Sequence, residues 1–374
     1  MTLRTLRRPF LLLLGILGTA AVSIIIIMNT TPFGSTPAGT RKERIERSPH
    51  YRDGQFRNLS HTPEITEGYT MLGVAYEFFF TSFPRLRPAG PLPSMKSDLL
   101  SLPPDQDVLV WFGHSSYFIQ IDGKRILVDP IFSGNASPIP GTTRSYPGTD
   151  RYTADDLPPI DYLFISHDHY DHVDVSTLKA LQQKVRLVIC GLGVGAHLER
   201  WGYESGQIVE RDWFDTVVPD SGFTIHTTPA RHFSGRSLFR NNTLWMSYVV
   251  KTPTMSFYIG GDSGYDTFFR EIGEQHGPFD LVMLDAGQYD KKWKYIHMLP
   301  EEVVPAAVDL KAKRLFPVHN SKFTLGNHPW DEPLTKVEEQ SRLLSMPLVT
   351  PMIGEVVRLK DAGQTFRPWW KGLE

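Results

Sequence analysis

Short apolar runs separated by turn signals recur from residue 108 onward and predict a series of β-strands. The first three are Val108 to Trp111, Tyr117 to Ile121 and, after the turn Asp122-Gly123, Arg125 to Val128. The later ones are Asp161 to Ile165, Arg186 to Ile189, Phe223 to Thr227, Thr243 to Lys251 and Ser256 to Ile259. Helical periodicity is found between them, near residues 176–183, 194–201, 265–275, 301–310 and 334–346. Mixed strands and helices of this kind indicate a layered α/β architecture.

Upstream of these elements, an uncharged apolar stretch runs from Phe10 to Met28 and is preceded by Arg4, Arg7 and Arg8. As a helix its 19 residues would span about 28 Å, close to the ~30 Å hydrocarbon core of a bilayer. The small residues that a signal-peptidase site requires lie in the middle of the stretch rather than at its end. We therefore predict a membrane anchor within residues 1–28, with a cleaved signal peptide as the alternative.

The region after the predicted anchor, residues 29–60, contains Pro, Gly, Ser and alternating charges without sustained periodicity, which is typical of a linker. The folded domain is therefore expected to occupy residues 61–374. Basic residues between positions 41 and 47 weaken the positive-inside argument that the first arginines provide. We predict a single membrane pass, with the folded domain outside the cytoplasm.

An apolar cluster lies between residues 69 and 93, where four phenylalanines, Phe78, Phe79, Phe80 and Phe83, precede Arg85 and Arg87. Apolar and cationic groups in this order are typical of a segment that rests on a membrane surface. A helix packed on the core of the domain accounts for the same residues and is the interpretation that we favour, with the membrane surface as the alternative.

Composition narrows the classes of function. Lys and Arg number 39 against 41 Asp and Glu, so there is no broad positive field to hold a phosphate backbone, and nucleic acid is not expected as a partner. A hydrophobic content of 41% suffices for one large core. The single cysteine, Cys190, excludes an intramolecular disulfide and a Cys-rich zinc module, and its apolar neighbours predict a core position.

Candidate chemistry is concentrated where the predicted strand at Asp161 to Ile165 ends. After Ser166 the chain continues with His167, Asp168, His169, Tyr170, Asp171 and His172. A tight loop at a strand end presents several side chains to one point. Histidine and carboxylate ligands without thiolate suit zinc, and also manganese or iron. In a protein interior this concentration would be costly without a cation, so the run predicts a metal site, with a solvated loop as the alternative.

The spacing His-x-His-x-Asp-His resembles that of the metallo-β-lactamase superfamily, and three further motifs follow in that family's order. They are Pro229-Ala230-Arg231-His232, Gly260-Gly261-Asp262-Ser263-Gly264-Tyr265 and Pro317-Val318-His319. The resemblance implies an α/β fold of the αββα sandwich type and two divalent metal ions, Zn²⁺ or alternatively Mn²⁺ or Fe²⁺. It implies one metal on His167, His169 and His232 and another on Asp171, His172 and His319, bridged by Asp262.

Two further residues match segments of the same family. Asp129, at the end of the strand predicted at Arg125 to Val128, matches an aspartate that accepts a hydrogen bond from a ligand imidazole and fixes its tautomer. A plain turn aspartate before Pro130 is the alternative. His114 also matches a family segment, and its role stays open between function and structure.

Within the superfamily, the chain looks most similar to the N-acyl-phosphatidylethanolamine-hydrolysing phospholipase D group and its bacterial relatives. The similarity runs from about Asp107 to Pro333 and is carried by Trp111-Phe112-Gly113-His114, Val128-Asp129-Pro130-Ile131-Phe132, Leu157-Pro158-Pro159-Ile160-Asp161, Gly277-Pro278-Phe279-Asp280 and Pro300-Glu301-Glu302. Two segments depart from the family pattern. Asn320-Ser321 stands where Trp-Gly is expected, and Gln288-Tyr289-Asp290 where Ala-Tyr-Glu is usual.

The resemblance implies a phosphodiesterase that cleaves a phospholipid of the N-acyl-phosphatidylethanolamine type with metal-activated water. Asp262 would set the metal separation, Asp171 would orient the water, and His297 would donate a proton to the substrate oxygen, a packing role being the alternative for His297. Competing functions are a lactonase or other ester hydrolase at the same dinuclear site, and a membrane-tethered metal-binding protein without turnover. The expected partners are a phospholipid or small ester and the membrane, and the sequence leaves the oligomeric state open.

Overall fold

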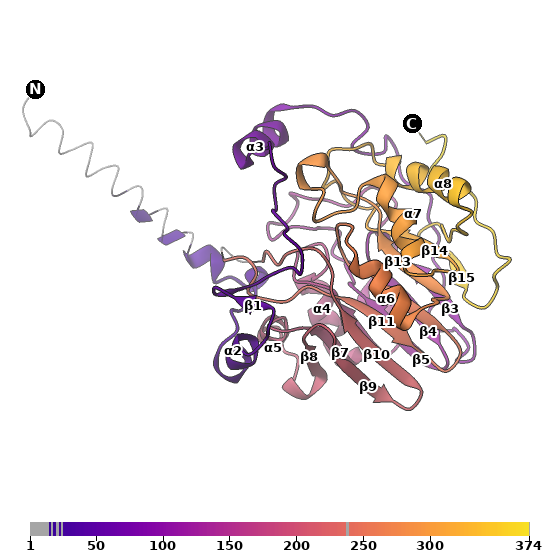
Figure 1. Ribbon diagram of the computed structural model, residues 1–374, viewed down its shortest axis with the longest axis horizontal. Coiled ribbons are helices and arrows are strands. Elements are labelled where there is room, and N and C mark those ends of the chain that lie inside the picture. Colours follow the sequence, from indigo (N-terminus) through magenta and orange to yellow (C-terminus); the bar gives the residue numbers. More distant parts are fainter. Residues whose placement is uncertain (1–14, 16–17, 20–21, 24, 237–238, 374) are drawn as a thin grey trace, which may run out of the picture.

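Two β-sheets packed face to face form the body of the protein, with helices on both outer faces (Figure 1). The computed structural model describes residues 15, 18–19, 22–23, 25–236 and 239–373. Among these residues, one sheet has seven strands in the order β15 (Val356–Arg358), β3 (Val108–Trp111), β4 (Tyr117–Ile121), β5 (Lys124–Val128), β6 (Ile160–Ile165), β7 (Val185–Gly191) and β8 (Ile208–Arg211). The other has six, in the order β14 (Leu315–Val318), β13 (Leu281–Asp285), β12 (Ser256–Ile259), β11 (Ser247–Lys251), β10 (Phe223–Thr228) and β9 (Thr216–Asp220).

Amphipathic helices complete the αββα sandwich that the sequence predicts. The outer face of the seven-stranded sheet packs against α4 (Val175–Leu181) and α5 (Gly195–Arg200), and Cys190 is buried in this layer as expected. The six-stranded sheet is covered by α6 (Phe268–His276), α7 (Pro300–Asp309) and α8 (Glu332–Leu344). Short 3₁₀ helices η1 to η5 lie at Thr31–Phe33, Ala154–Asp156, Gln182–Lys184, Ser205–Gln207 and Lys291–Trp293.

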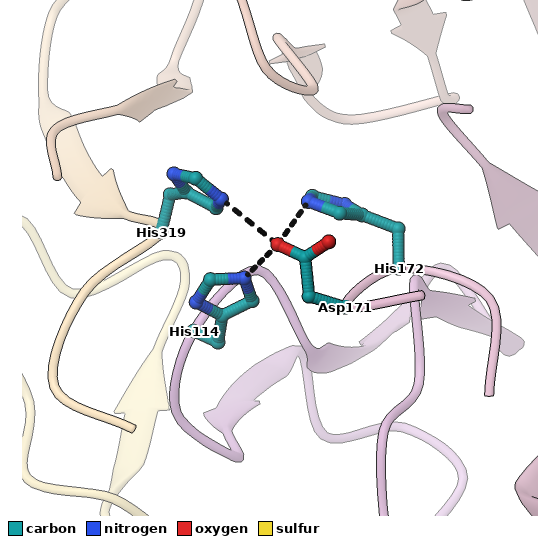
Figure 2. Close-up of side chains that lie close together, drawn as sticks. All are labelled: His114, Asp171, His172 and His319. Atoms are coloured by element: carbon teal, nitrogen blue, oxygen red, sulfur yellow. Dashed lines mark hydrogen bonds and ion pairs between the residues drawn. The ribbon is translucent and has the colours of Figure 1, made fainter. Parts of the chain in front are cut away.

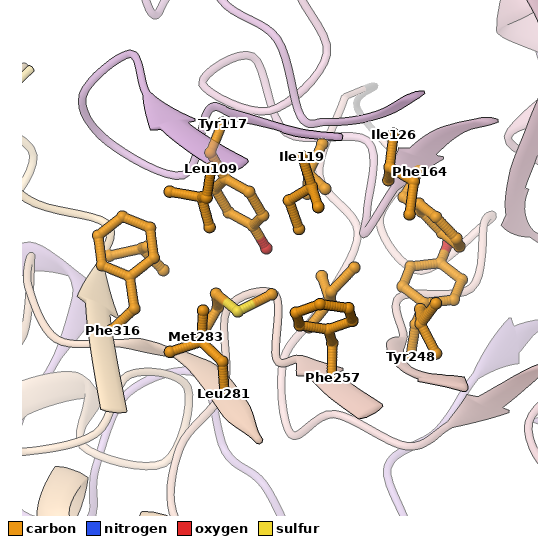
Figure 3. Packing of buried hydrophobic residues seen from close by; sticks show 14 of the residues in the cluster. Leu109, Tyr117, Ile119, Ile126, Phe164, Tyr248, Phe257, Leu281, Met283 and Phe316 are labelled. Atoms are coloured by element: carbon orange, nitrogen blue, oxygen red, sulfur yellow. The ribbon is translucent and has the colours of Figure 1, made fainter. Parts of the chain in front are cut away.

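Side chains from the inner faces of the two sheets form one apolar layer between them (Figure 3). Leu109, Ile119 and Phe164 come from the seven-stranded sheet and meet Tyr248 and Phe257 of the six-stranded sheet, and all five are fully buried. Truncating one such phenylalanine to alanine typically costs about 3–5 kcal/mol. The layer therefore fixes the two sheets relative to each other, and with them the loops at their edges.

Strand direction brings several loops to one edge of the sandwich. In the first sheet β5, β6, β7 and β8 are parallel, and in the second β12, β13 and β14 are parallel. One antiparallel strand lies between β3 and β5, so β3 runs parallel to β5. For the same reason β10 runs parallel to β12. The loops after β3, β5, β6, β10, β12, β13 and β14 carry the candidate site residues.

Residues 29–60, which the sequence predicts as a linker, contact the body of the protein. They contain η1, α2 (Gly39–Glu46) and a hairpin of β1 (Tyr51–Arg52) and β2 (Gln55–Phe56). Ile45 and Phe56 belong to the main core cluster, and Arg41 forms ion pairs of 2.9 Å with Glu199 and Glu210. Because the buried residues Ile45 and Phe56 are far apart in the sequence, they produce no hydrophobic periodicity. The sequence therefore did not predict that this segment packs on the domain. The division of the chain at residue 60 stays a prediction.

The predicted anchor and the apolar cluster between residues 69 and 93 have different outcomes. The anchor at Phe10 to Met28 lies for the most part outside the described residues, and in the part of the chain that is described no helix is long and apolar enough to cross a bilayer. The second segment forms α3 (Met71–Phe80), which stands apart from the sandwich (Figure 1). None of its described side chains is buried. The described side chains of α3 therefore do not pack into the core as we expected, and contact of this segment with a membrane surface stays a prediction.

Candidate metal centre

The histidine-rich run occupies the tight loop after β6. Asp129 fixes the start of the loop, because its Oδ1 accepts the Ser166 N–H at 2.9 Å and its Oδ2 accepts the Ser166 hydroxyl at 2.6 Å. The His172 N–H donates to the His169 carbonyl at 3.2 Å, and α4 begins shortly afterwards with Asp174 as its N-cap. The loop is held at both ends, which fixes the directions of its side chains.

The first cluster consists of His167, His169, His232 and Asp262, whose ligand atoms all lie within 4.8 Å of one another. Nδ1 of His169 is 2.9 Å from Nε2 of His167 and 3.1 Å from Nε2 of His232. A neutral imidazole has one donor and one acceptor, so hydrogen bonds alone do not satisfy three converging ring nitrogens. This convergence is the ligand arrangement of a metal ion.

The second cluster consists of His114, Asp171, His172 and His319. Figure 2 shows three imidazole rings around one carboxylate oxygen. Oδ2 of Asp171 lies 2.8 Å from Nε2 of His114, 3.3 Å from that of His319 and 3.5 Å from that of His172. His114, whose role the sequence leaves open, therefore belongs to the centre.

Asp262 lies between the two clusters. Its Oδ2 is 3.1 Å from Nε2 of both His172 and His319 in the second cluster. The same oxygen is 3.7 Å from Nε2 of His167 and 3.8 Å from Nε2 of His232 in the first. A carboxylate that contacts both clusters has the position of a bridging ligand.

Unusual backbone conformations occur at several of these positions. His114, Asp129 and His319 have positive φ angles of 55°, 38° and 65°. A β-carbon at Gly261, the residue before the bridging aspartate, would lie 2.8 Å from Cβ of Ser166, so only glycine allows the two loops to approach this closely. Strain of this kind is typical of functional sites, where the surrounding structure holds it in place.

Ring nitrogens on the outer sides of the clusters have partners that set their tautomers. Oδ2 of Asp129 lies 2.9 Å from Nδ1 of His172, which is the contact that the sequence predicts. The Ile296 carbonyl lies 2.9 Å from Nδ1 of His232. These contacts place a proton on Nδ1 and leave Nε2 of each ring to face the centre.

Asp285, which no sequence motif singles out, links two histidines at the end of β13. Its Oδ1 lies 3.0 Å from Nδ1 of His319 and its Oδ2 lies 2.7 Å from Nδ1 of His297. The rings of His297 and His319 are stacked, with centroids 5.0 Å apart, and Asp262, His297 and His319 form a third group with metal-ligand spacing. The sequence shows Asp285 only as an aspartate at the end of the apolar run Leu281 to Leu284, which does not reveal its contacts.

Burial and neighbouring charge divide the histidines into two kinds. Burial lowers the pKa of His167 and His232 well below the ordinary value, so their rings are neutral and carry free lone pairs. Burial also opposes the charging of His319, but the carboxylates of Asp262 and Asp285 outweigh it and raise the pKa of His319 to about 10. The carboxylates thus hold a proton at a position where a divalent cation would supply the balancing charge.

Unpaired buried atoms test whether these residues suit a metal. Nε2 of His172 and Oδ1 of Asp262 are buried, and neither forms a hydrogen bond among the described residues, although Nε2 of His172 lies 3.1 Å from Oδ2 of Asp262. Leaving such atoms unpaired costs roughly 1–3 kcal/mol each. Histidines and aspartates without thiolate fit Zn²⁺, Mn²⁺ or Fe²⁺. The residues therefore fit two divalent ions, one in each cluster, and the ligand assignment of each residue stays a prediction.

Asn58, in the segment predicted as a linker, holds the loop of one candidate ligand from behind. Its Nδ2 donates to the His232 carbonyl at 2.7 Å, and its Oδ1 accepts the His232 N–H at 3.2 Å and Nε1–H of Trp245 at 3.0 Å. The amide therefore pairs with both backbone groups of His232, as a neighbouring strand would. We infer that Asn58 positions His232 in the first cluster.

Replacing Asn58 by Leu is expected to weaken metal binding at the first cluster by about 10- to 100-fold, the range for residues that support metal ligands. The free energy of unfolding should fall by about 1–3 kcal/mol, because the His232 backbone groups stay buried without partners. Asn58→Asp keeps the acceptor for the His232 N–H but places a second, charged acceptor against the His232 carbonyl, so its affinity should also fall. Competition with a chromophoric chelator measures the affinities, and equal affinity in all three proteins would contradict the positioning role.

The two segments that depart from the family pattern brace loops beside the centre. Oε1 of Gln288 accepts the N–H groups of Leu325 and Gly326 at 2.7 and 2.8 Å. Nδ2 of Asn320 donates to the Val318 carbonyl at 3.0 Å, and its Oδ1 accepts the Ser321 hydroxyl at 2.8 Å. Both side chains are buried, so these departures first affect how the loops around the second cluster are held.

Comparison with known proteins adds the following. Residues 124–320 match the family described as the β-lactamase superfamily domain. A Mycobacterium tuberculosis protein described as uncharacterized is 39% identical over 333 residues, which make up 87% of this chain and 88% of the relative. The N-acyl-phosphatidylethanolamine-hydrolyzing phospholipase D 1 of Caenorhabditis elegans is 29% identical over 275 residues, or 67% of this chain and 75% of that enzyme.

The fold also recurs among solved structures. Igni18, a metallo hydrolase from the archaeon Ignicoccus hospitalis, has a TM-score of 0.52 and 19% sequence identity, and the similarity covers 68% of this chain and 98% of Igni18. At this identity the similarity shows the fold alone. The family match of residues 124–320 includes every candidate ligand from His167 to His319, whereas His114 and Asn58 precede it.

Proposed function

Because this chain belongs to the metallo-β-lactamase superfamily and is a metal-dependent hydrolase, we propose that it cleaves a phosphodiester in a phospholipid of the N-acyl-phosphatidylethanolamine type. The observation that carries the proposal is the pair of His/Asp clusters that share Asp262. The similarity to the nematode enzyme supports the substrate class. A lactonase or other ester hydrolase with the same centre is the second candidate.

The proposed metals are two Zn²⁺ ions, with Mn²⁺ and Fe²⁺ as alternatives. One ion would be held by His167, His169 and His232. The other would be held by Asp171, His172 and His319, and Asp262 would contribute to both. When bound, such a pair activates water and neutralises negative charge on phosphate oxygens.

The carboxylates of the centre differ in their access to solvent. Asp171 is 9% exposed, against 3% for Asp262, and its Oδ2 is surrounded by the three rings of the second cluster. Asp171 is therefore the better placed of the two to orient an attacking water. Asp262 sets the separation between the clusters.

His297 is placed to move a proton. Its Nδ1 lies 2.7 Å from Oδ2 of Asp285, so Nε2 is the nitrogen available to substrate. The Asp285 carboxylate accepts from Nδ1–H, and a proton carried on Nε2 would pass to the oxygen that leaves phosphorus. His297 would thus act as the general acid, and Asp285 would hold its ring.

The substrate class is tested by hydrolysis in ¹⁸O-labelled water. With vesicles that contain N-acyl-phosphatidylethanolamine, the water oxygen should bond to phosphorus as the bond between phosphorus and the head-group oxygen breaks. The released phosphatidate should therefore carry one ¹⁸O, and kcat/KM should exceed that for a panel of lactones by at least about tenfold. A preference for lactones would transfer the assignment to the second candidate. A metal-loaded chain without turnover on either class would indicate a tethered binding protein.

We also propose that the segment from Phe10 to Met28 anchors the chain in a membrane, with the catalytic domain outside the cytoplasm. The support is the length and uncharged character of this stretch in the sequence. Release of the full-length chain from membranes by alkaline carbonate would contradict the anchor.

A further inference from the structure

Helix α3 is apolar and yet exposed. Its side chains Leu72, Tyr76, Phe78 and Phe80 are between 64% and 83% exposed. The helix is well formed, because the Thr70 hydroxyl caps its first turn by accepting a backbone N–H at 3.1 Å. A contiguous apolar surface of this kind marks a site of interaction with a partner or a membrane.

The width of the apolar surface favours lipid over protein as the partner. At about 100° per residue, Met71, Leu72, Tyr76, Phe78 and Phe80 spread over roughly 200° of the helix circumference. A helix that packs on a protein face typically presents a stripe of about 100°. A helix that lies in the boundary between head groups and acyl chains buries its apolar side chains to a depth of about 5–10 Å.

The charged side chain of α3 forms an ion pair with a residue outside the helix. Glu77 is the single charged residue of α3, and its Oε2 lies 2.8 Å from Nζ of Lys292 in η5. The Lys292 carbonyl accepts the Thr66 N–H at 2.7 Å. Because η5 precedes His297 by only a few residues, these contacts tie α3 to the segment that carries the proposed general acid.

A second apolar surface lies on the same side of the molecule. Ile25, Ile26 and Ile27, at the described end of the N-terminal apolar run, are between 51% and 63% exposed. In Figure 1 the N-terminal segment leaves the left of the body, and α3 stands above it at the upper left. Exposed Arg87 follows α3, and tyrosine and arginine beside an apolar helix are typical of a membrane interface.

We propose that α3 docks on the surface of a lipid bilayer. Its ion pair with Lys292 then keeps the segment that bears His297 close to that bilayer. The inference rests on the proposed function for its purpose, which is delivery of a lipid substrate to the centre. The docking itself is measurable without turnover.

The test places a single fluorescent label on α3. Because Cys190 is buried, a cysteine introduced at position 72 is the reactive thiol in the full-length Leu72→Cys protein. Leu343→Cys provides the matched control, since Leu343 is a leucine of α8 that is 75% exposed, against 83% for Leu72. Both proteins are labelled with an environment-sensitive dye and reconstituted into phosphatidylethanolamine and phosphatidylglycerol vesicles, with or without brominated acyl chains.

Brominated lipid is expected to quench the label at position 72 by more than half and to leave the label at position 343 nearly unchanged. Equal, weak quenching at both positions would overturn the proposal. So would a label at position 72 that is shielded from brominated lipid and becomes more shielded as protein concentration rises, because a second copy of the chain would then cover α3.

A second pair of variants separates docking from substrate choice. Leu72→Glu should reduce turnover of vesicle substrate severalfold and leave turnover of a soluble short-chain phosphodiester unchanged, whereas Leu343→Glu should change neither. Strong quenching at position 72 without phosphodiester turnover would retain the docking surface and reject the proposed substrate. Equal loss of both activities in Leu72→Glu would show a structural role for α3 and contradict its docking role.

Discussion

Replacing Asp262 by Asn is expected to remove at least one of the two proposed metal ions and to lower kcat by roughly 100- to 1,000-fold. The carboxylate contacts both clusters, with Oδ2 3.1 Å from Nε2 of His172 and His319 and less than 4 Å from Nε2 of His167 and His232. An amide keeps the shape and loses the charge. A metal pair contributes several kcal/mol to catalysis, and about 1.4 kcal/mol corresponds to a factor of ten in rate.

Elemental analysis of the purified protein measures the metal content, and near-ultraviolet circular dichroism checks that the variant is folded. Glu210→Gln is the matched control, because Glu210 is as buried as Asp262, both being 3% exposed. Its carboxylate pairs with Arg41 at 2.9 Å, away from the centre, so Glu210→Gln should lose stability and keep both ions. Two full equivalents of metal and unchanged kcat in Asp262→Asn would refute the bridging role.

The sequence predicts the central strands closely and the others poorly. The predicted bounds of β3, β4 and β12 agree with the structure, because these runs are apolar and are separated by clear turn residues. In contrast, β13 and β14 were not predicted. Both are short and completely buried, as β3 and β4 also are, so burial alone does not explain the difference. β14 contains Pro317, a residue that argues against a strand. The peripheral strands β8, β9 and β15 depend on their pairing partners more than on their own composition.

The metal centre also contains residues that the sequence reveals and residues that it does not. All seven candidate ligands were accessible from the sequence, because they occur in short ordered motifs, and the structure brings all seven together. Asp285 and Asn58 were not accessible from the sequence, since each acts through a contact with a residue distant in the chain. Asn58 lies 174 positions before His232, in a segment without periodicity. Contacts of this kind become visible only when strand pairing is known.

Replacing Asp285 by Asn is expected to lower kcat/KM by about 10- to 100-fold, the range for residues that orient metal ligands. The carboxylate accepts from two rings, with Oδ1 3.0 Å from Nδ1 of His319 and Oδ2 2.7 Å from Nδ1 of His297. An amide offers one acceptor and one donor to the same two nitrogens. One ring must therefore change its tautomer or lose its hydrogen bond.

The two outcomes for Asp285→Asn differ in what they impair. If His319 changes its tautomer, Nε2 becomes protonated and metal affinity at the second cluster falls. If His297 is affected, metal affinity is kept and proton donation to the leaving oxygen is lost. A diaryl phosphodiester separates them, because an aryloxide leaves without protonation and loss of the general acid hardly affects its rate.

His297→Gln provides the reference for a pure proton-transfer defect, with the loss confined to alkyl leaving groups. We expect Asp285→Asn to show this leaving-group dependence together with weaker metal binding, because one carboxylate holds both rings. A defect of equal size for aryl and alkyl substrates, with unchanged metal affinity, would mean that Asp285 supports the fold and not the two histidines. The position of His297 would then have to depend on its stacking against His319 alone, at the centroid distance of 5.0 Å.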